Sequence, residues 1–228
     1  NEALRSLTDY HYRHCSEYKS IIDTLKYNRN TSYSYEEFPF LPVRLFKDYK
    51  LSSINEENIF KTMNSSGTSG QDVSKIYLDK ENASLQTKVL IKIVSTILGN
   101  KRLPMLIIDS KSVIKDRNIF TARGAGIIGF SIFGKDVTYA LDDNMDLDIE
   151  KIDDFTQRHK NEKIFIFGFT FIIWKYFIKY IHDNNLKLPR LDGVVIHGGG
   201  WKKLADEAMD NIQFKKSVYD ACGVKNVI

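Results

Sequence analysis

The amino-acid sequence predicts an α/β fold whose mixed or mostly parallel sheet is flanked by helices. Through the second half of the chain, short apolar runs alternate with segments of helical periodicity, a pattern typical of parallel strands joined by helices. The composition can supply the core of such a fold, because the 228 residues are 43% hydrophobic and include 14 Phe and 12 Tyr. We find no internal repeat and no low-complexity linker.

The first 34 residues are expected to form a helical segment, followed by a second domain over residues 35–228. Apolar residues recur at spacings of three and four between residues 2 and 26, which predicts one or two helices. Pro39 and Pro42 force extended backbone on the aromatic run that comes next. We interpret this run as a strap over the core, although such a strap could also wall a binding site.

The first candidate site is a loop rich in glycine and hydroxyl groups, with the sequence Ser65-Ser66-Gly67-Thr68-Ser69-Gly70-Gln71. Apolar segments flank it at residues 59–63 and 75–78, so we expect a strand, a tight loop and a second strand. Glycine lets the backbone approach a ligand closely, and successive N–H groups with Ser and Thr hydroxyls can hold an anion such as a polyphosphate. The loop is not a Walker A motif, which needs a Lys directly after its last glycine. A flexible surface turn is the alternative interpretation.

Helices and strands are expected to alternate after this loop. A helix with an apolar face over residues 85–97 is ended by Gly99. The strand over residues 103–109 ends in Asp109, at a position where open α/β sheets often place ligand groups. Residues 120–133 contain Arg123-Gly124-Ala125-Gly126, which does not match the dinucleotide-binding fingerprint. We interpret the acidic run over 142–154 as helix caps and solvated surface.

The C-terminal third carries the second candidate site. We expect strands at residues 163–168, 191–196 and 224–228, a buried helix at 169–181, and helices at 201–209 and 213–221. Three consecutive glycines follow one of these strands, in the sequence His197-Gly198-Gly199-Gly200. They remove side chains over a wide area, so a flat ring such as adenine could lie directly on the backbone. A plain strand-to-helix loop is the alternative.

Charge, cysteine content and hydropathy exclude several classes of function. The net charge of +4 is spread along the chain, whereas a nucleic-acid-binding protein usually has a concentrated basic stripe; a mild positive bias could instead attract an anionic substrate. Cys15 and Cys222 form no C-x-x-C motif, so neither a metal site nor a redox motif is predicted, and a reduced, cytoplasmic setting fits. The longest apolar run, residues 164–174, is too short to span a bilayer.

Taken together and in this order, the two glycine motifs resemble those of the LuxE-type acyl-protein synthetases, a branch of the adenylate-forming superfamily. Leu41-Pro42, Phe46-Lys47 and residues 167–170 add to the resemblance, which extends from about residue 35 to the last residue. The resemblance implies the fold of the large N-terminal domain of adenylate-forming enzymes.

The resemblance also implies an ATP-dependent, Mg²⁺-assisted ligase. Such an enzyme activates a carboxylic acid, here a fatty acid, as acyl-AMP and passes the acyl group to a protein cysteine thiol on an acyl-accepting or reductase partner. Residues 65–71 would hold the ATP phosphates, and His197, Gly198, Gly199 and Gly200 would carry the adenine. Phe169, Thr170 and Trp201 would border the acyl pocket.

Several departures from the family pattern leave alternatives open. The superfamily usually has a Lys three residues after the last glycine of the phosphate loop, where this chain has Val73. Lys75 could take its place or lie on a solvated strand, and His197 could contact substrate or be a structural hydrogen-bonding group. The family's later catalytic motifs, its small lid domain and its acceptor cysteine have no counterpart here, so we expect a partial adenylation domain over 35–228 that is inactive alone. The alternatives are an acyl-CoA ligase and a non-catalytic nucleotide- or partner-binding module.

Overall fold

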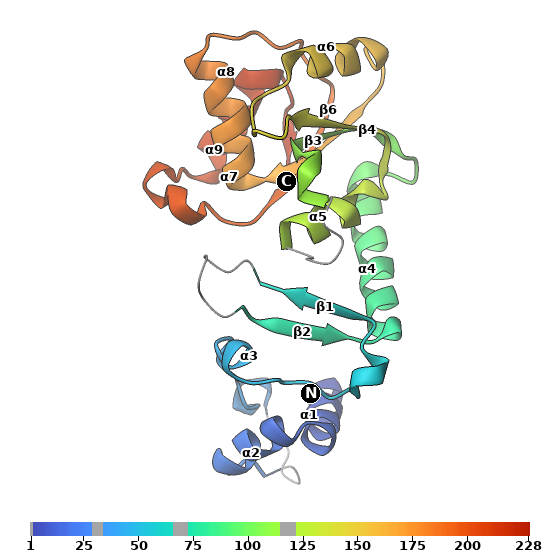
Figure 1. The fold of residues 1–228 in the computed structure, drawn as a ribbon, viewed down its shortest axis with the longest axis vertical. Coiled ribbons are helices and arrows are strands. Elements are labelled where there is room, and N and C mark those ends of the chain that lie inside the picture. The colour runs from blue at the N-terminus through green and yellow to red at the C-terminus, as the bar shows by residue number, and fades with distance from the viewer. Residues whose placement is uncertain (1, 29–33, 66–72, 115–121) are drawn as a thin grey trace. The chain divides into compact units, whose positions relative to one another are not determined.

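The computed structural model describes residues 2–28, 34–65, 73–114 and 122–228 (Figure 1). The chain divides into two compact units. The first comprises Asn1–Leu90 with Phe120–Ala122, and the second comprises Ile91–Ile119 with Arg123–Ile228. None of the helices in the described ranges combines the length and the apolarity that crossing a membrane requires.

The first unit begins with two helices, as the periodicity predicted. They are α1 (Glu2–His14) and α2 (Ser16–Thr24), and the buried Cys15 between them caps α2 by accepting a hydrogen bond from the N–H of Tyr18 at 3.4 Å. A short helix, α3 (Leu45–Asp48), precedes an antiparallel hairpin of β1 (Lys61–Asn64) and β2 (Lys75–Leu78). The strands predicted on either side of the first glycine motif are therefore confirmed.

The second unit contains a five-stranded sheet in which every neighbouring pair of strands is parallel. Helix α4 (Lys80–Leu98) leads into it and ends before Gly99, whose φ of 81° suits a helix C-terminus. The sheet order is β4-β3-β5-β6-β7. The strands are β3 (Leu103–Ser110), β4 (Gly134–Leu141), β5 (Ile164–Phe169), β6 (Gly193–Gly198) and β7 (Asn226–Val227).

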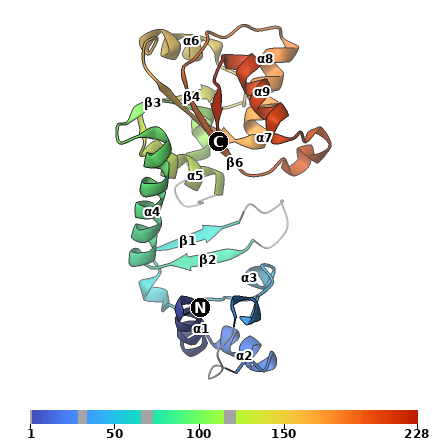
Figure 2. The same ribbon diagram turned by 180° about the vertical axis from the view of Figure 1, so that it is seen from behind.

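The helices that connect these strands pack on both faces of the sheet, so the predicted α/β class is confirmed. They are α5 (Ala122–Ser131), α6 (Ile149–Arg158), α7 (Thr170–Ile172), α8 (Lys179–Asp183) and α9 (Asn211–Cys222). Both Figure 1 and Figure 2 show α8 beside α9. On the opposite face, Phe130 of α5 stacks on Phe167 of β5 with ring centroids 4.3 Å apart.

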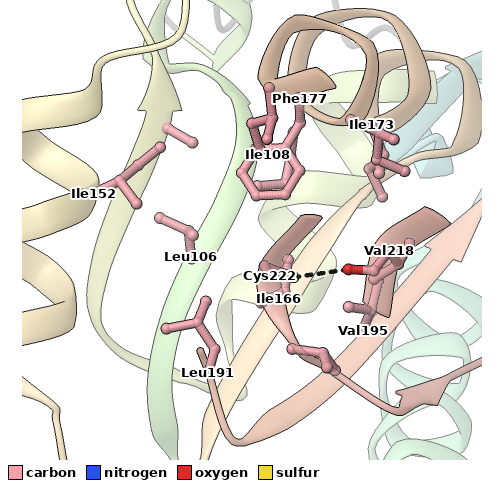
Figure 3. Close-up of a cluster of buried hydrophobic side chains, with 14 of the residues drawn as sticks. Leu106, Ile108, Ile152, Ile166, Ile173, Phe177, Leu191, Val195, Val218 and Cys222 are labelled. Carbon is pink, nitrogen blue, oxygen red and sulfur yellow. Dashed lines mark hydrogen bonds between the residues drawn. The ribbon is translucent and has the colours of Figure 1, made fainter. Parts of the chain in front are cut away.

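One apolar cluster joins the sheet to α6, α7, α8 and α9 (Figure 3). Alternate residues of a strand point to opposite faces, so Leu106, Ile166 and Val195 all meet this helical layer. Phe177 and Val218 are among the helical residues that pack in this cluster. Phe177 lies in a π-helical stretch, Ile173–Ile178, between α7 and α8, which periodicity alone did not predict.

The structure adds helices and a strand that the sequence did not reveal, among them α3, α5, β4 and α6, and it changes one expected helix. Strand β4 lies at the edge of the sheet. A bulge at Asp136, where φ is 46°, breaks the alternation of side chains between its two faces. Helix α6 lies in the acidic run, and its N-cap is Asp148, which agrees with the interpretation of these carboxylates as caps. The helix expected over 201–209 is a short 3₁₀ segment, Lys202–Glu207, interrupted by a non-helical Leu204.

The strand order places a reversal of direction between β3 and β5. From β3 the chain moves outward to β4, then crosses back to β5 and continues through β6 to β7. In open parallel sheets of this kind, ligands bind outside the carboxyl ends of the strands at such a reversal. The fold therefore predicts a ligand site at the carboxyl ends of β3 and β5.

We expect Gly193→Ala to destabilise the second unit, because a Cβ at Gly193 would lie 2.3 Å from the backbone oxygen of Ile164 on β5. Overpacking of this kind costs roughly 1–3 kcal/mol of unfolding free energy, measurable by urea denaturation. Gly200→Ala is the matched control, since no described atom lies within 4 Å of a Cβ at Gly200. Equal stabilities of the two variants would contradict the packing shown for β5 and β6.

Candidate functional site

The candidate site lies at the carboxyl edge of the parallel sheet. Phe169 at the end of β5 is paired in register with Gly198 at the end of β6, and Ile108 of β3 is paired with Gly168. Asp109, the next residue of β3, is thus brought to the same edge as Phe169 and the glycine loop. Residues separated by about 90 positions in sequence therefore share one edge only because the strands are parallel.

The glycine loop after β6 leaves bare backbone exposed. Gly199 has a φ of 77°, a conformation that favours glycine, and a Cβ there would lie 3.0 Å from the ring of Phe169. Gly198 and Gly200 show no positive φ, and no described atom lies within 4 Å of a Cβ built on either. The described part of the chain itself does not require glycine at these two positions, although glycine there raises the entropy cost of folding. A ligand that lies on the backbone would require it.

The hydroxyl of Thr170 anchors this loop through hydrogen bonds. Its side chain is buried, and its Oγ1 lies 3.1 Å from the Gly198 carbonyl oxygen, 2.9 Å from that of Gly199 and 2.9 Å from Nδ1 of His197. Carbonyl oxygens only accept hydrogen bonds, so the single hydroxyl hydrogen is directed to them and Nδ1–H donates to Oγ1. This assigns the hydrogen of His197 to Nδ1 and leaves Nε2 as an acceptor.

The imidazole of His197 is neutral near pH 7. Partial burial lowers its pKa below the usual value, and the nearby positive charge of Lys215 lowers it further. The ring lies 4.6 Å from that of Phe214 on α9, and the N–H of His197 donates to the carbonyl of Ile228 at 3.0 Å. The position of His197 is thus fixed by a backbone hydrogen bond, a ring contact and a hydrogen bond at Nδ1.

The three residues predicted to border an acyl pocket are held by different elements. The ring of Phe169 lies against Gly126 of α5, where a Cβ would come within 3.0 Å of it, and against Gly199. Trp201 instead packs edge-on against Phe214, with ring centroids 6.0 Å apart, and against Trp174 at 5.9 Å. Thr170 turns its hydroxyl to the glycine loop. Phe169 and Trp201 therefore flank the loop from the α5 side and the α9 side.

Ser65 is the one residue of the first glycine motif that the structure describes, and it lies directly after β1. The N–H of Ser65 donates to the Ser74 carbonyl at 2.9 Å, and the N–H of Ser74 donates to Oγ of Ser65 at 3.0 Å. Lys75 is exposed at the start of β2, opposite Asn64. Ser66, Gly67, Thr68, Ser69, Gly70 and Gln71 lie outside the described residues. Because this hairpin belongs to the first unit and the glycine loop to the second, their joint use for one nucleotide remains a prediction.

An ion pair at the edge was not assigned as a site from the sequence. Asp109 is completely buried, and its Oδ2 accepts a hydrogen bond from Nε of Arg123 at 2.6 Å, while Oδ1 accepts from Nη2. The sequence did show an Asp at the end of a buried strand and an Arg near the next helix, but not that they meet. No group of three His, Cys, Asp or Glu side chains among the described residues is arranged to hold a metal ion.

Neither cysteine is arranged as a nucleophile. Cys222 is fully buried, its Sγ donates to the Val218 carbonyl at 3.3 Å, and burial raises the pKa of its thiol to about 11 (Figure 3). Cys15 is also buried, as the cap of α2. A nucleophilic cysteine needs a low pKa and access to solvent, so the acceptor role is excluded for Cys222 by its environment.

Comparison with known proteins identifies relatives over nearly the whole chain. A family model described as "Acyl-protein synthetase, LuxE" matches residues 2–228. A curated protein of Aliivibrio fischeri, the long-chain-fatty-acid–luciferin-component ligase, is 24% identical over 235 residues. The match covers 96% of this chain and 57% of that protein, so the chain spans a little over half the length of this relative.

We expect Thr170→Val to lower the free energy of unfolding by about 1 kcal/mol, because it removes the hydroxyl that binds the Gly198 and Gly199 carbonyls. Thr156→Val is the matched control. Thr156 is similarly buried, but among the described residues its hydroxyl bonds only to the Ile152 carbonyl one turn back in α6. That carbonyl already accepts a helical hydrogen bond. Urea denaturation checks both variants, and a loss no larger for Thr170→Val would count against its role in the loop.

We expect Cys222 to resist iodoacetamide in the folded protein. With a pKa of about 11, about one thiol in a thousand is ionised at pH 8, and the group is covered as well. Mass spectrometry should find Cys222 unmodified in buffer and modified in urea. If Cys222 of the folded protein reacted as fast as free cysteine, the burial described for its thiol would be wrong.

Proposed function

This chain belongs to the LuxE family of acyl-protein synthetases, and on that premise we propose that it supplies the nucleotide- and acyl-binding part of an enzyme that joins a fatty acid to a protein thiol. The relative in Aliivibrio fischeri is named for a long-chain fatty acid and a luciferin component. We extend the first part of that name, a fatty acid, to the substrate of this chain.

The proposed reaction has two steps: ATP activates the acid, and the acyl group is then transferred to a thiol. A carboxylate oxygen attacks the α-phosphorus of ATP, and pyrophosphate leaves with the electron pair of the broken P–O bond, giving acyl-AMP. A cysteine thiolate then attacks the acyl carbon, and AMP leaves, giving a thioester. The first step brings two anions together, so the site must supply hydrogen-bond donors and positive charge.

The observation that carries this proposal is the bare backbone of the glycine loop at the carboxyl edge of the sheet. Gly198 and Gly200 leave open space where side chains would stand, as a flat adenine ring would need. Thr170 binds the carbonyls of Gly198 and Gly199, so the loop is held in one conformation before a ligand arrives. A site organised in advance loses less entropy on binding.

The remaining roles are proposed from the resemblance. We propose that the loop over 65–71 and Lys75 bind the ATP phosphates, with the Ser65–Ser74 hydrogen bonds fixing the base of the loop. Phe169 and Trp201 would border the acyl chain on the two sides of the glycine loop. Mg²⁺ would accompany the phosphates, and we assign it no ligand among the described residues, which offer no suitable cluster.

The thiol acceptor is proposed to be another protein or another part of the enzyme. Cys15 and Cys222 are both buried, and neither could reach an acyl-adenylate in solvent. We expect the 228 residues to bind nucleotide without completing the reaction. The LuxE membership favours a protein thiol over coenzyme A as acceptor.

We expect the full-length gene product to exchange radioactive pyrophosphate into ATP only when a fatty acid is present. Gly199→Ala should reduce this exchange at least tenfold, because Ala is strained at a φ of 77° and its Cβ would press on Phe169 at 3.0 Å. Thioester formation is then measured with added protein thiols and with coenzyme A.

Gly99→Ala provides the matched control for that experiment. Gly99 has a similar φ of 81°, but no described atom lies within 4 Å of a Cβ there, and the residue follows the end of α4. Exchange should be unchanged in this variant. Fatty-acid-dependent exchange that is equally lost in both variants, or undisturbed in Gly199→Ala, would refute the assignment of the glycine loop.

A further inference from the structure

Arg123 is held in a fixed orientation by a buried carboxylate. Asp109 is 0% exposed, and both of its oxygens receive hydrogen bonds from the guanidinium, with Nε to Oδ2 at 2.6 Å. Oδ1 also accepts from the N–H of Ser110 at 2.6 Å. The two-point contact fixes the plane of the guanidinium as well as its position. The Arg123 side chain is nevertheless 28% exposed, so its other side reaches solvent.

A strained turn contacts the same guanidinium. Met145, in the turn after β4, has a φ of 70°, which is uncommon for a residue other than glycine, and its sulfur lies 3.2 Å from Nη2 of Arg123. Asp142 maintains the turn, since its Oδ1 accepts from the N–H groups of Asn144 and Asp146 at 2.8 and 2.9 Å. Strained backbone that the surroundings enforce is found preferentially at binding and catalytic sites.

The guanidinium keeps donors that these contacts do not use. It carries five N–H bonds, and the contacts to Asp109 and Met145 engage Nε and Nη2 only. No hydrogen bond or ion pair joins Nη1 to a residue in the described ranges. A partly exposed guanidinium with a fixed plane and unused donors on Nη1 is suited to bind a carboxylate or a phosphate.

Arg123 also lies close to the glycine loop. It is one helical turn before Gly126 on α5, so the two residues share a face of the helix. A Cβ built on Gly126 or on Gly199 would lie 3.0 Å from the ring of Phe169, so this ring lies against both glycines. Arg123 therefore stands at the β3–β5 reversal of the sheet, two contacts away from the loop proposed to carry adenine.

We propose that Arg123, oriented by Asp109 and Met145, binds an oxyanion of a reactant at this edge: the carboxylate of the acid or a phosphate oxygen of the nucleotide. This assignment rests on the proposed function, because it takes the anion from the reactants of acyl activation. Positive charge at this point would offset the repulsion between the two anions that must meet. Asp109 and Met145 act as positioning residues and do not touch the ligand.

The test measures binding of two probes, sodium decanoate and AMP, to the 228-residue chain by calorimetry. Removing Arg123 alone would leave Asp109 buried and unpaired, so the main variant is the double substitution D109N/R123Q, in which neither side chain is charged. We expect it to weaken binding of at least one probe tenfold or more. Arg123→Lys, which keeps the charge but not the planar fork, should give an intermediate loss.

Arg158→Gln is the matched control. Arg158 pairs with Asp154 at 3.0 Å and with Asp136 on α6 and β4, at the surface and away from the glycine loop. Its removal should change probe affinity less than twofold. Melting temperatures of all variants establish that each is folded.

The pattern of losses identifies the anion. Weaker binding of decanoate alone assigns the carboxylate, weaker binding of AMP alone assigns the phosphate, and weaker binding of both indicates that one guanidinium serves each reactant; all three support the inference. Unchanged affinity for both probes in folded D109N/R123Q overturns it, as does failure of the wild-type chain to bind either probe.

A second measurement covers the case in which the variants do not fold. Phenylglyoxal modifies accessible arginines, and peptide mapping of the wild-type chain reports Arg123 and Arg158 separately. We expect a saturating probe to slow modification of Arg123 at least fivefold and that of Arg158 not at all. Equal rates with and without probe would overturn the inference.

Failure of this inference can be told apart from failure of the proposed function. If the full-length product exchanges pyrophosphate and Arg123 does not affect probe binding, only the role of Arg123 is wrong. If exchange is absent while probe binding depends on Arg123, the anion site stands and the ligase reaction does not.

Discussion

The parallel direction of all five strands is the constraint on which the candidate site depends. Parallel strands put their carboxyl ends at one edge, so the residue that ends each strand is delivered to the same place whatever its distance in sequence. The reversal of strand order between β3 and β5 keeps the connecting segments of these two strands apart and opens that edge to a ligand. Asp109, Phe169 and the glycine loop are adjacent for this reason alone.

Two groups of glycines in the second unit differ in their physical causes. Gly134, Gly168 and Gly193 are required by packing, since a Cβ at any of them would lie within 3 Å of a neighbouring atom. Gly198 and Gly200 meet no described neighbour. Folding explains the first group completely. For the second group, we propose an adenine ring lying on the backbone as the reason for glycine.

Buried polar groups at the edge are satisfied by one another, and this gives the site its rigidity. Thr170 bonds to the glycine loop and to His197, and Asp109 bonds to Arg123 and to the backbone of Ser110. Leaving a buried polar group without a partner costs free energy. Conformations that break the hydrogen bonds of Thr170 or Asp109 are therefore disfavoured. The loop and the guanidinium are thus both fixed by contacts that no ligand has to provide.

Local properties of the sequence were sufficient for much of this protein. Periodicity located α4, β3, β5 and α9, and the two glycine motifs indicated the LuxE resemblance, because helices, strands and glycine loops each depend on residues a few positions apart. Strand β4 was missed because its edge position and the bulge at Asp136 break the alternation, and α6 was hidden in an acidic run. Only the tertiary structure decided that Arg123 meets Asp109, that Thr170 holds Gly199 and that Phe169 lies between two glycines. These contacts depend on strand order and direction, which are properties of the whole sheet and of no local stretch of sequence.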